Sequence, residues 1–291
     1  MRLGGPIFKQ VKNIKELIDV HRKFGFAATY CPYIADRTER KECKSAFAEA
    51  DIIFAEYGAY GINILDTNKN NSEKNIEEIC KRLEYADQMG ALCCVMLGGT
   101  VQTGGWGQPG GWGHANPENL SEKSFYKTVE IVQRIIDSVK PDKTKLVMET
   151  ESYLLPDNPQ IYLDLLKAVD RPSFAVHLDP VNIISSPRLF YYNADFIKEC
   201  FAKLGPWIVS CHAKDVLIYN HATVYINETY LGNGFLDYGV YLNEISKLEI
   251  PPPLMIEHLN EYQLVKACDY IFKKAEETGV HFKYSELREA K

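Results

Sequence analysis

Short apolar runs alternate along the chain with longer segments in which apolar residues recur at helical spacing. Within the runs, polar and apolar residues do not alternate, which is typical of parallel strands buried on both faces. Two glycines and a proline at 4–6 weaken only the first run. The pattern predicts eight strands, at residues 3–8, 26–31, 52–57, 92–97, 145–148, 174–178, 208–211 and 254–256.

The segments between these runs have the pattern of amphipathic helices. In the segment before Gly90, apolar residues fall on one face, and glycine is a residue type that commonly ends a helix. Ser121 is placed to cap the start of a second helix. Near the end of the chain, Asn260 followed by Gln263 resembles a capping box.

Repeated strand–helix units imply a parallel sheet with right-handed crossovers. Eight such units close a barrel, whereas an open doubly wound sheet normally has fewer strands. No linker or low-complexity stretch divides the 291 residues, and barrels often use about 250 residues as one domain. We therefore predict an α/β fold, a (β/α)8 TIM barrel, with residues 1–291 as a single domain.

Composition narrows the classes of partner and compartment. The net charge of −6 argues against nucleic acid or an anionic membrane as the main partner, because both require a basic face. The chain has no run of about 20 apolar residues, and its first ten residues lack the apolar core of a signal peptide. Its eight cysteines form no C-x-x-C pair. We therefore expect a cytoplasmic protein with reduced, buried thiols.

Residues that can bind metal or protons follow four of the predicted strands. Glu149 follows the run KLVM, and Asp179 follows FAVHL. His212 follows IVSC, and Glu257 follows LMI. The carboxyl ends of barrel strands meet at one mouth, where catalytic groups gather. Three carboxylates buried there require a counter-charge, and Lys214 is the only base close to these strand ends.

A divalent cation is the simplest counter-charge for these side chains. Three carboxylates and one imidazole suit Mn²⁺, Mg²⁺, Co²⁺ or Zn²⁺, and the majority of hard oxygen ligands favours Mn²⁺. The alternative is that each acid caps the next helix or pairs with a neighbouring base. We predict one divalent metal ion held by four residues: Glu149, Asp179, His212 and Glu257.

Around these residues, the chain resembles the xylose-isomerase-like sugar isomerases and epimerases. The resemblance covers roughly residues 20–280 and implies a TIM barrel, one divalent metal and a carbohydrate substrate. Relatives include ketose 3-epimerases, hydroxypyruvate isomerase, inosose dehydratase and endonuclease IV. The chain departs from the epimerases at Asn182, where those enzymes usually have histidine. The matching motifs are HLDPVN at 177–182, CHAKD at 211–215, LGNGFLDY at 231–238 and MIEHL at 255–259.

Such a site is suited to proton transfer at carbon. A metal that chelates a carbonyl and the neighbouring hydroxyl acidifies the C–H between them, and a carboxylate can then remove that proton. Return of the proton to the other face gives an epimer, and return to the neighbouring carbon gives an isomer. We expect Glu149 and Glu257 to act as the paired acid/base residues as well as metal ligands.

Further residues are candidates for substrate contacts, each with a structural alternative. His177 shares a strand face with Asp179, although a hydrogen-bonded core histidine fits equally well. Lys214 is expected to contact a substrate oxygen, or else to form a salt bridge to Asp215 or Glu257. The remaining candidates are Glu56, which ends a strand, and His114 and Trp112 from the segment 103–114. Glu228, which precedes the LGNG motif, is a further candidate, although a surface role fits it equally well.

The segment 103–114 is rich in glycine and contains two tryptophans. It matches G-x-G-x-x-G, but Pro109 lies within the match and the next helical pattern starts only near Ser121. We therefore reject a dinucleotide site. We expect a loop over the mouth, in which Trp112 stacks on the substrate and His114 contacts it or acts as a general base. The alternative is an ordinary surface loop.

Several functions remain open at this stage. The leading one is an isomerase or epimerase of a free or phosphorylated sugar. The second is a metal-dependent lyase, of the dehydratase or C-glycoside-cleaving type, on the same scaffold. An abasic-site nuclease like endonuclease IV is disfavoured by Asn182 and the acidic composition, and a non-catalytic sugar-binding barrel is the fourth. A homo-oligomer is compatible with such barrels, but no apolar helix face decides the oligomeric state.

Overall fold

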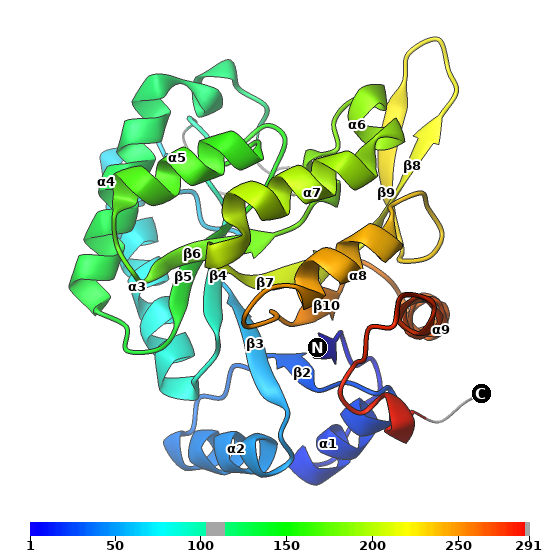
Figure 1. The fold of residues 1–291 in the computed structure, drawn as a ribbon. Helices are drawn as coiled ribbons and strands as arrows, with labels where there is room; N and C mark the ends of the chain where they lie inside the picture. The colour runs from blue at the N-terminus through cyan, green and yellow to red at the C-terminus, as the bar shows by residue number, and fades with distance from the viewer. Residues whose placement is uncertain (103–113, 289–291) are drawn as a thin grey trace. The chain divides into compact units, whose positions relative to one another are not determined.

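The computed structural model describes residues 1–102 and 114–288, and in them eight strands close into a barrel. Around the barrel the strands are ordered β1-β10-β7-β6-β5-β4-β3-β2. The predicted (β/α)8 barrel is confirmed, and all eight predicted strands are present (Figure 1). The barrel strands are β1 (Leu3–Gly4), β2 (Ala28–Tyr30), β3 (Ile53–Gly58), β4 (Cys93–Met96), β5 (Lys145–Glu149), β6 (Phe174–Leu178), β7 (Ile208–Ala213) and β10 (Leu254–Ile256).

The helices begin and end at the residues that the local sequence favours. Ser121 caps its helix by accepting a hydrogen bond from the Ser124 N–H, and Asn260 with Gln263 forms the predicted capping box. Gly90 ends its helix with φ +81°, a conformation that glycine adopts without strain. The helices are α1 (Ile14–Lys23), α2 (Arg37–Glu49), α3 (Lys69–Met89), α4 (Glu122–Val139), α5 (Pro159–Val169), α6 (Pro187–Tyr191), α7 (Asn193–Leu204), α8 (Tyr238–Ser246) and α9 (Glu261–Thr278).

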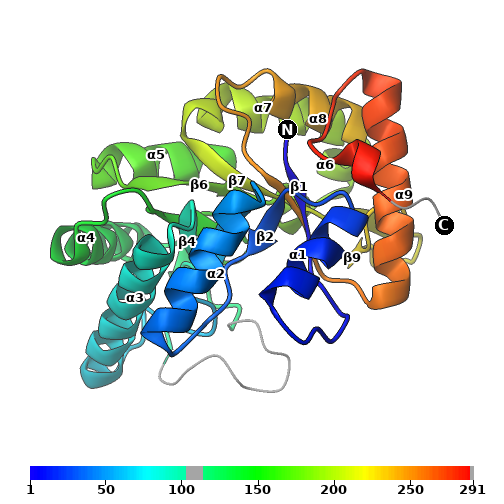
Figure 2. The same cartoon turned by 90° about the horizontal axis from the view of Figure 1, so that it is seen from below.

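The described chain divides into two compact units. Unit 1 comprises residues 1–55, 179–206 and 210–291, and unit 2 comprises 56–178 and 207–209. In unit 2, α3, α4 and α5 pack side by side in sequence order (Figures 1 and 2). Each unit buries its own group of barrel side chains.

The strand interiors are filled by small and sulfur-containing side chains. In unit 1, Ala28, Ala55 and Met255 form a buried cluster. A Cβ on Gly4 would lie 2.5 Å from the Met255 sulfur, so only glycine fits at this point of β1. In unit 2 the corresponding cluster consists of Cys93, Val95, Val147 and Ala175.

All eight cysteines are free thiols, and seven of them are buried, as the sequence predicts. Burial raises the pKa of Cys94 to about 12, so this thiol stays protonated and unreactive at neutral pH. Within the residues that the structure describes, no helix is long and apolar enough to cross a membrane.

One element was not predicted from the sequence. Between β7 and α8, the chain forms an antiparallel hairpin of β8 (Asp215–Tyr219) and β9 (Tyr225–Thr229), which contacts α6 within unit 1 (Figure 1). Its second strand is largely exposed and has no apolar periodicity, so the hydrophobic pattern gave no signal for it.

Candidate metal centre

Three of the four predicted metal ligands come together within unit 1. Asp179 follows β6, His212 lies in β7, and Glu257 follows β10 directly. His212 Nδ1 lies 2.7 Å from Glu257 Oε1 and 3.4 Å from Asp179 Oδ2. One ligand atom of each residue lies within 4.8 Å of the other two. In the parallel register of β7 and β10, His212 pairs with Met255, which places Glu257 just beyond the shared end.

A buried lysine lies among these carboxylates. Lys214 is 1% exposed, and its Nζ lies 2.9 Å from both Asp179 Oδ2 and Glu257 Oε1. The same ammonium donates a hydrogen bond of 2.7 Å to Asn182 Oδ1 and lies 3.1 Å from Glu228 Oε2. The predicted salt bridge of Lys214 to Glu257 is therefore present, and the predicted contact to a substrate oxygen stays a prediction.

The surrounding charges keep both ligand carboxylates ionised. Burial raises the pKa of Asp179, but Lys214 and His212 outweigh it, and the net shift is downward. Burial also raises the pKa of Glu257, and again His212 and Lys214 reverse the sign. The cluster therefore presents carboxylates, not carboxylic acids, at neutral pH.

The donor atoms of these residues are better arranged to bind a divalent cation than to satisfy one another by hydrogen bonds. Glu257 Oε1 is buried and has two nitrogen atoms within 2.9 Å, but within the described residues it accepts no hydrogen bond of normal geometry. Such an oxygen has the position of a metal ligand. Two carboxylates and an imidazole are a donor set that Mn²⁺, Mg²⁺, Co²⁺ and Zn²⁺ accept.

Two residues outside the predicted ligand set lie next to the cluster, Glu228 on the hairpin and His258 after β10. His258 Nδ1 lies 2.9 Å from Glu228 Oε2, and His258 Nε2 lies 3.5 Å from Glu257 Oε2. The hydrogen bond to Glu228 raises the pKa of His258 against the effect of burial. From the sequence, Glu228 was a candidate for which a surface role fitted equally well, and His258 had no assigned role. The only signal for His258 was that it directly follows Glu257.

Asp215 anchors the hairpin and the glycine-rich loop that follows it. Its Oδ1 accepts hydrogen bonds of 2.9 Å from the N–H groups of Val216 and Leu236, and its Oδ2 accepts one of 3.0 Å from Gly232. A Cβ on Gly234 would lie 2.3 Å from Asp215 Oδ1, so the loop closes around this carboxylate only with glycine there. The LGNG motif is thus explained by its contacts with Asp215.

Unit 2 contains the other predicted site residues. Glu149 is the last residue of β5, is 4% exposed, and pairs in register with His177 on β6. His177 Nε2 lies 3.1 Å from Glu56 Oε1, and both side chains are buried. The buried Tyr162 hydroxyl accepts hydrogen bonds from the backbone N–H groups of Met148 and His177, which fixes the ends of these two strands.

The predicted loop contacts are only partly described by the structure. Trp112 lies outside the described residues. His114 is exposed, and its backbone oxygen accepts hydrogen bonds of 2.9 Å from Thr100 Oγ1 and Asn119 Nδ2. The proposed contacts of His114 and Trp112 with a substrate stay predictions.

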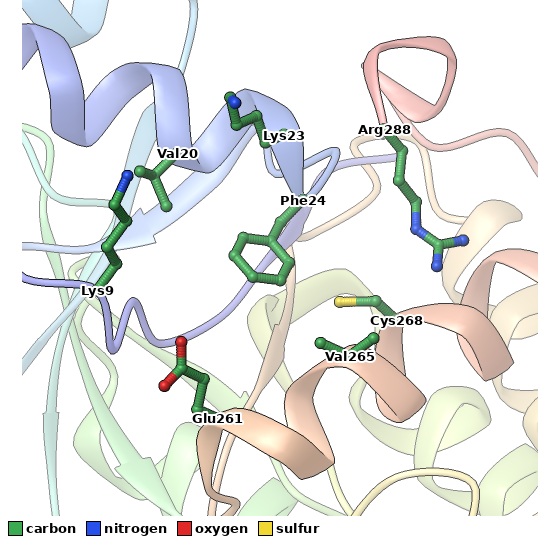
Figure 3. Close-up of a pocket in the computed structure, with 8 residues that line it drawn as sticks. All are labelled: Lys9, Val20, Lys23, Phe24, Glu261, Val265, Cys268 and Arg288. Atoms are coloured by element: carbon green, nitrogen blue, oxygen red, sulfur yellow. The ribbon is translucent and has the colours of Figure 1, made fainter. Parts of the chain in front are cut away.

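A separate cavity of about 180 Å³ lies between α1 and α9 in unit 1 (Figure 3). Two of its cations already have acidic partners, because Lys9 pairs with Glu16 and Arg288 pairs with Asp269. Burial raises the pKa of Cys268 in its wall to about 12, so this thiol is a poor nucleophile. Among its lining residues, Glu261 is the one carboxylate, so the cavity has no group of carboxylates like the one around His212.

Comparison with known proteins agrees with the geometry. The model of the family described as "Xylose isomerase-like TIM barrel" matches residues 18–280. The chain belongs to this family. No curated protein matches it.

Solved structures share the fold of this family member at low sequence identity. A xylose isomerase-like TIM barrel protein from Mycobacterium smegmatis, in complex with magnesium, is 14% identical with a TM-score of 0.63, covering 92% of this chain and 90% of that one. A probable 3-DHS dehydratase from Bacillus anthracis is 16% identical with a TM-score of 0.66, over 90% and 94%. D-psicose 3-epimerase from Clostridium cellulolyticum H10, with D-tagatose, is 12% identical with a TM-score of 0.66, over 97% and 100%.

Proposed function

We propose that this protein is a divalent-metal-dependent isomerase or epimerase of a sugar or sugar phosphate. The observation that carries the proposal is the buried cluster of Asp179, His212 and Glu257, in which both carboxylates are ionised. Membership of the xylose isomerase-like family supports it, and similar folds include an enzyme named as an epimerase.

We assign Glu149 as the fourth metal ligand. It is the last residue of β5 and is 4% exposed, so its carboxylate is buried at the end of a barrel strand like those of the other proposed ligands. Parallel strands of a closed barrel end at one face, where the active sites of such barrels are found. Mn²⁺ is our first choice for the ion, because oxygen ligands are in the majority.

The ionised side chains supply the base for proton transfer. A bound divalent cation polarises a carbonyl oxygen and acidifies the neighbouring C–H. The lowered pKa of Glu257 means that its carboxylate accepts a proton and does not enter the reaction as an acid. Glu149 is the second acid/base group, and the two residues together return the proton to the opposite face or to the neighbouring carbon. Substrate hydroxyls are bound by Lys214, and by His177 with Glu56.

A lyase on the same scaffold is the second candidate, and His258 favours it. The hydrogen bond that His258 donates to Glu228 raises the pKa of His258, so the imidazole carries a proton closer to neutral pH, and its Nε2 lies 3.5 Å from Glu257 Oε2. A base and a proton donor side by side suit removal of a C–H proton and protonation of a departing hydroxyl group. One structure with the same fold is named as a probable dehydratase.

A panel of sugars and sugar phosphates incubated with enzyme and Mn²⁺ in deuterated water tests the proposal. NMR and mass spectrometry should show deuterium incorporated at one carbon, and a product with the mass of the substrate apart from that exchange. Loss of water or of an aglycone identifies a lyase instead. Metal analysis that finds three zinc ions per chain favours the nuclease.

Replacement of each proposed base tests the assignment within the same assay. Glu149→Gln and Glu257→Gln should each lower turnover by about 10²- to 10⁴-fold, the usual contribution of a positioned acid/base group. Glu73→Gln, which breaks a surface pair with Arg134, is the matched control and should retain activity. Near-native turnover in both site variants with metal bound contradicts the assignment.

A further inference from the structure

Lys214 has two kinds of partner in unit 1. Asp179 and Glu257 are assigned as metal ligands, and the ammonium lies 2.9 Å from an oxygen of each. Asn182 and Glu228 are outside the ligand set, and their oxygen atoms lie 2.7 and 3.1 Å from the same Nζ. Lys214 is thus shared between oxygens that are assigned to the metal and oxygens of two residues outside the ligand set.

The ammonium and a divalent cation compete for the same atoms. Asp179 Oδ2 and Glu257 Oε1, which lie closest to Lys214, are also the carboxylate oxygens closest to His212 Nδ1. Two cations a few ångströms apart in a buried site repel each other strongly. A site that holds both the ammonium and the metal ion needs other acceptors, which bind the lysine when the metal binds these carboxylate oxygens. Removing a lysine from water without such acceptors is costly.

Glu228 is held in place to be such an acceptor. It lies on β9 opposite Val216 in the hairpin register, and Asp215 at the start of β8 is fixed by hydrogen bonds from three backbone N–H groups. From the other side, His258 Nδ1 lies 3.0 and 2.9 Å from the two carboxylate oxygens. His258 has φ +50°, a left-handed conformation that is uncommon for a residue other than glycine. This backbone conformation occurs at the residue whose imidazole contacts Glu228.

We infer that Glu228 is a positioning residue that draws Lys214 away from Asp179 and Glu257, and so lets the cluster bind its divalent cation. The inference rests on the metal site of the proposed function, but it concerns metal affinity and does not depend on which reaction follows. It also gives the β8–β9 hairpin a role, because that hairpin carries Glu228.

The test is a double-mutant cycle on metal affinity at one fixed pH. Mn²⁺ binding to the metal-free full-length protein is measured by calorimetry and by competition with a chelating dye, for wild type, Glu228→Gln, Lys214→Met and the double variant. Glu228→Gln should weaken binding by about 10- to 100-fold, the usual effect of losing a partner behind the metal ligands. Lys214→Met should tighten binding, because it removes the competing charge.

The diagnostic result is the effect of Glu228→Gln in the Lys214→Met background. If Glu228 acts through the lysine, this effect should be at least about 5-fold smaller than in wild type, whereas independent sites give equal effects within about 2-fold. Glu228→Asp should restore part of the affinity. Glu244→Gln removes the charge of another glutamate of unit 1, one that pairs with Lys247 2.6 Å away, and should leave Mn²⁺ affinity unchanged.

Each outcome decides between the two proposals. Failure of the wild-type protein to bind Mn²⁺, Mg²⁺, Co²⁺ or Zn²⁺ overturns the proposed function. Wild-type binding that Glu228→Gln does not weaken, or weakens equally with and without Lys214, overturns the role of Glu228 alone. Circular dichroism checks the fold of each variant. Asn182→Ala, which removes the other non-ligand acceptor, serves as a second variant and should also weaken binding if the lysine competes.

Discussion

Two buried histidines of this barrel each lie beside a carboxylate, but their surroundings differ in charge. In unit 1, His212 lies next to Asp179 and Glu257. In unit 2, His177 Nε2 lies 3.1 Å from Glu56 Oε1. His212 is thus part of a charged cluster with two carboxylates, whereas the contact between His177 and Glu56 joins one imidazole to one carboxylate.

The difference teaches that the surplus of carboxylates, not burial, marks the metal site. Around Lys214, the two buried carboxylates of Asp179 and Glu257 outnumber the one permanent cation, and the more exposed Glu228 adds a third carboxylate. Such a surplus is unstable when buried unless another cation joins it. The Glu56–His177 pair has no such surplus by itself, so its natural role is to orient groups by hydrogen bonding.

The largest effect on Mn²⁺ affinity is expected from removing the imidazole of His212, and removal of the His177 imidazole is the matched comparison. Loss of a residue that contacts a metal ligand weakens metal binding by about 10- to 100-fold. His212→Ala should weaken Mn²⁺ binding by more than this, because it removes a ligand itself. His177→Ala should change the affinity by less than about 10-fold, since we assign His177 to the binding of substrate hydroxyls and not to the metal. Calorimetric titration of both variants with Mn²⁺ measures the contrast.

An equal loss of Mn²⁺ affinity in the two variants would contradict the distinction between the His212 cluster and the Glu56–His177 pair. Mg²⁺ titrations of the same proteins provide the control, because a general folding defect lowers the fraction of active sites and leaves the affinity of the remaining sites unchanged.

Much of this contrast could be predicted from the sequence. Because barrel strands are buried on both faces, a charged residue directly after an apolar run is conspicuous, and this signal located Asp179, His212 and Glu257. The sequence could not choose between the roles of Lys214, since a salt bridge and a substrate contact require the same residue at the same place. The ion pairs to Asp179 and Glu228 depend on the folded chain.

The hairpin was not predicted from the sequence, which therefore could not choose between a site role and a surface role for Glu228. The residues of β9 are largely exposed, so no hydrophobic period indicates a strand. Asp215 was considered only as a partner of Lys214, yet it accepts hydrogen bonds from three backbone N–H groups that come from both sides of the hairpin. Contacts of this kind are set by the tertiary path of the backbone, which residue type and spacing do not encode.

A smaller effect should follow from removing the charge of Glu56. Glu56→Gln keeps an oxygen that can accept from His177 but loses the charge, and hydrogen bonds to charged groups contribute roughly 1 kcal/mol more than neutral ones. The free energy of unfolding, measured with urea, should fall by about 1 kcal/mol, with little change in Mn²⁺ affinity. Glu78→Gln, in the surface pair with Arg82, is the control and should cost about 0.5 kcal/mol or less. A loss of Mn²⁺ binding in Glu56→Gln would place this pair in the metal site.

The last prediction concerns a third buried imidazole, which shows what burial does without a carboxylate. His21 of unit 1 is 1% exposed, and its two ring nitrogens lie 2.8 Å from Leu17 O and from Thr29 Oγ1. Burial lowers the pKa of His21, and the hydrogen bond to Leu17 opposes this only in part. A folded-state pKa below the unfolded value of 6.5 means that the stabilisation is present above about pH 6.5 and is lost as the pH falls towards the folded-state pKa.

The test compares wild type with His21→Gln in urea, with chelator present, between pH 7.5 and pH 5. The stability advantage of the wild type should shrink as the pH falls, by at most about 1.4 kcal/mol per pH unit, because one proton is involved. An advantage that stays constant over this range would mean that the buried imidazole does not lose its neutral form there. Burial would then be too weak to set the charge of a histidine in this barrel, and the comparison of the three buried imidazoles would rest on their neighbouring carboxylates alone.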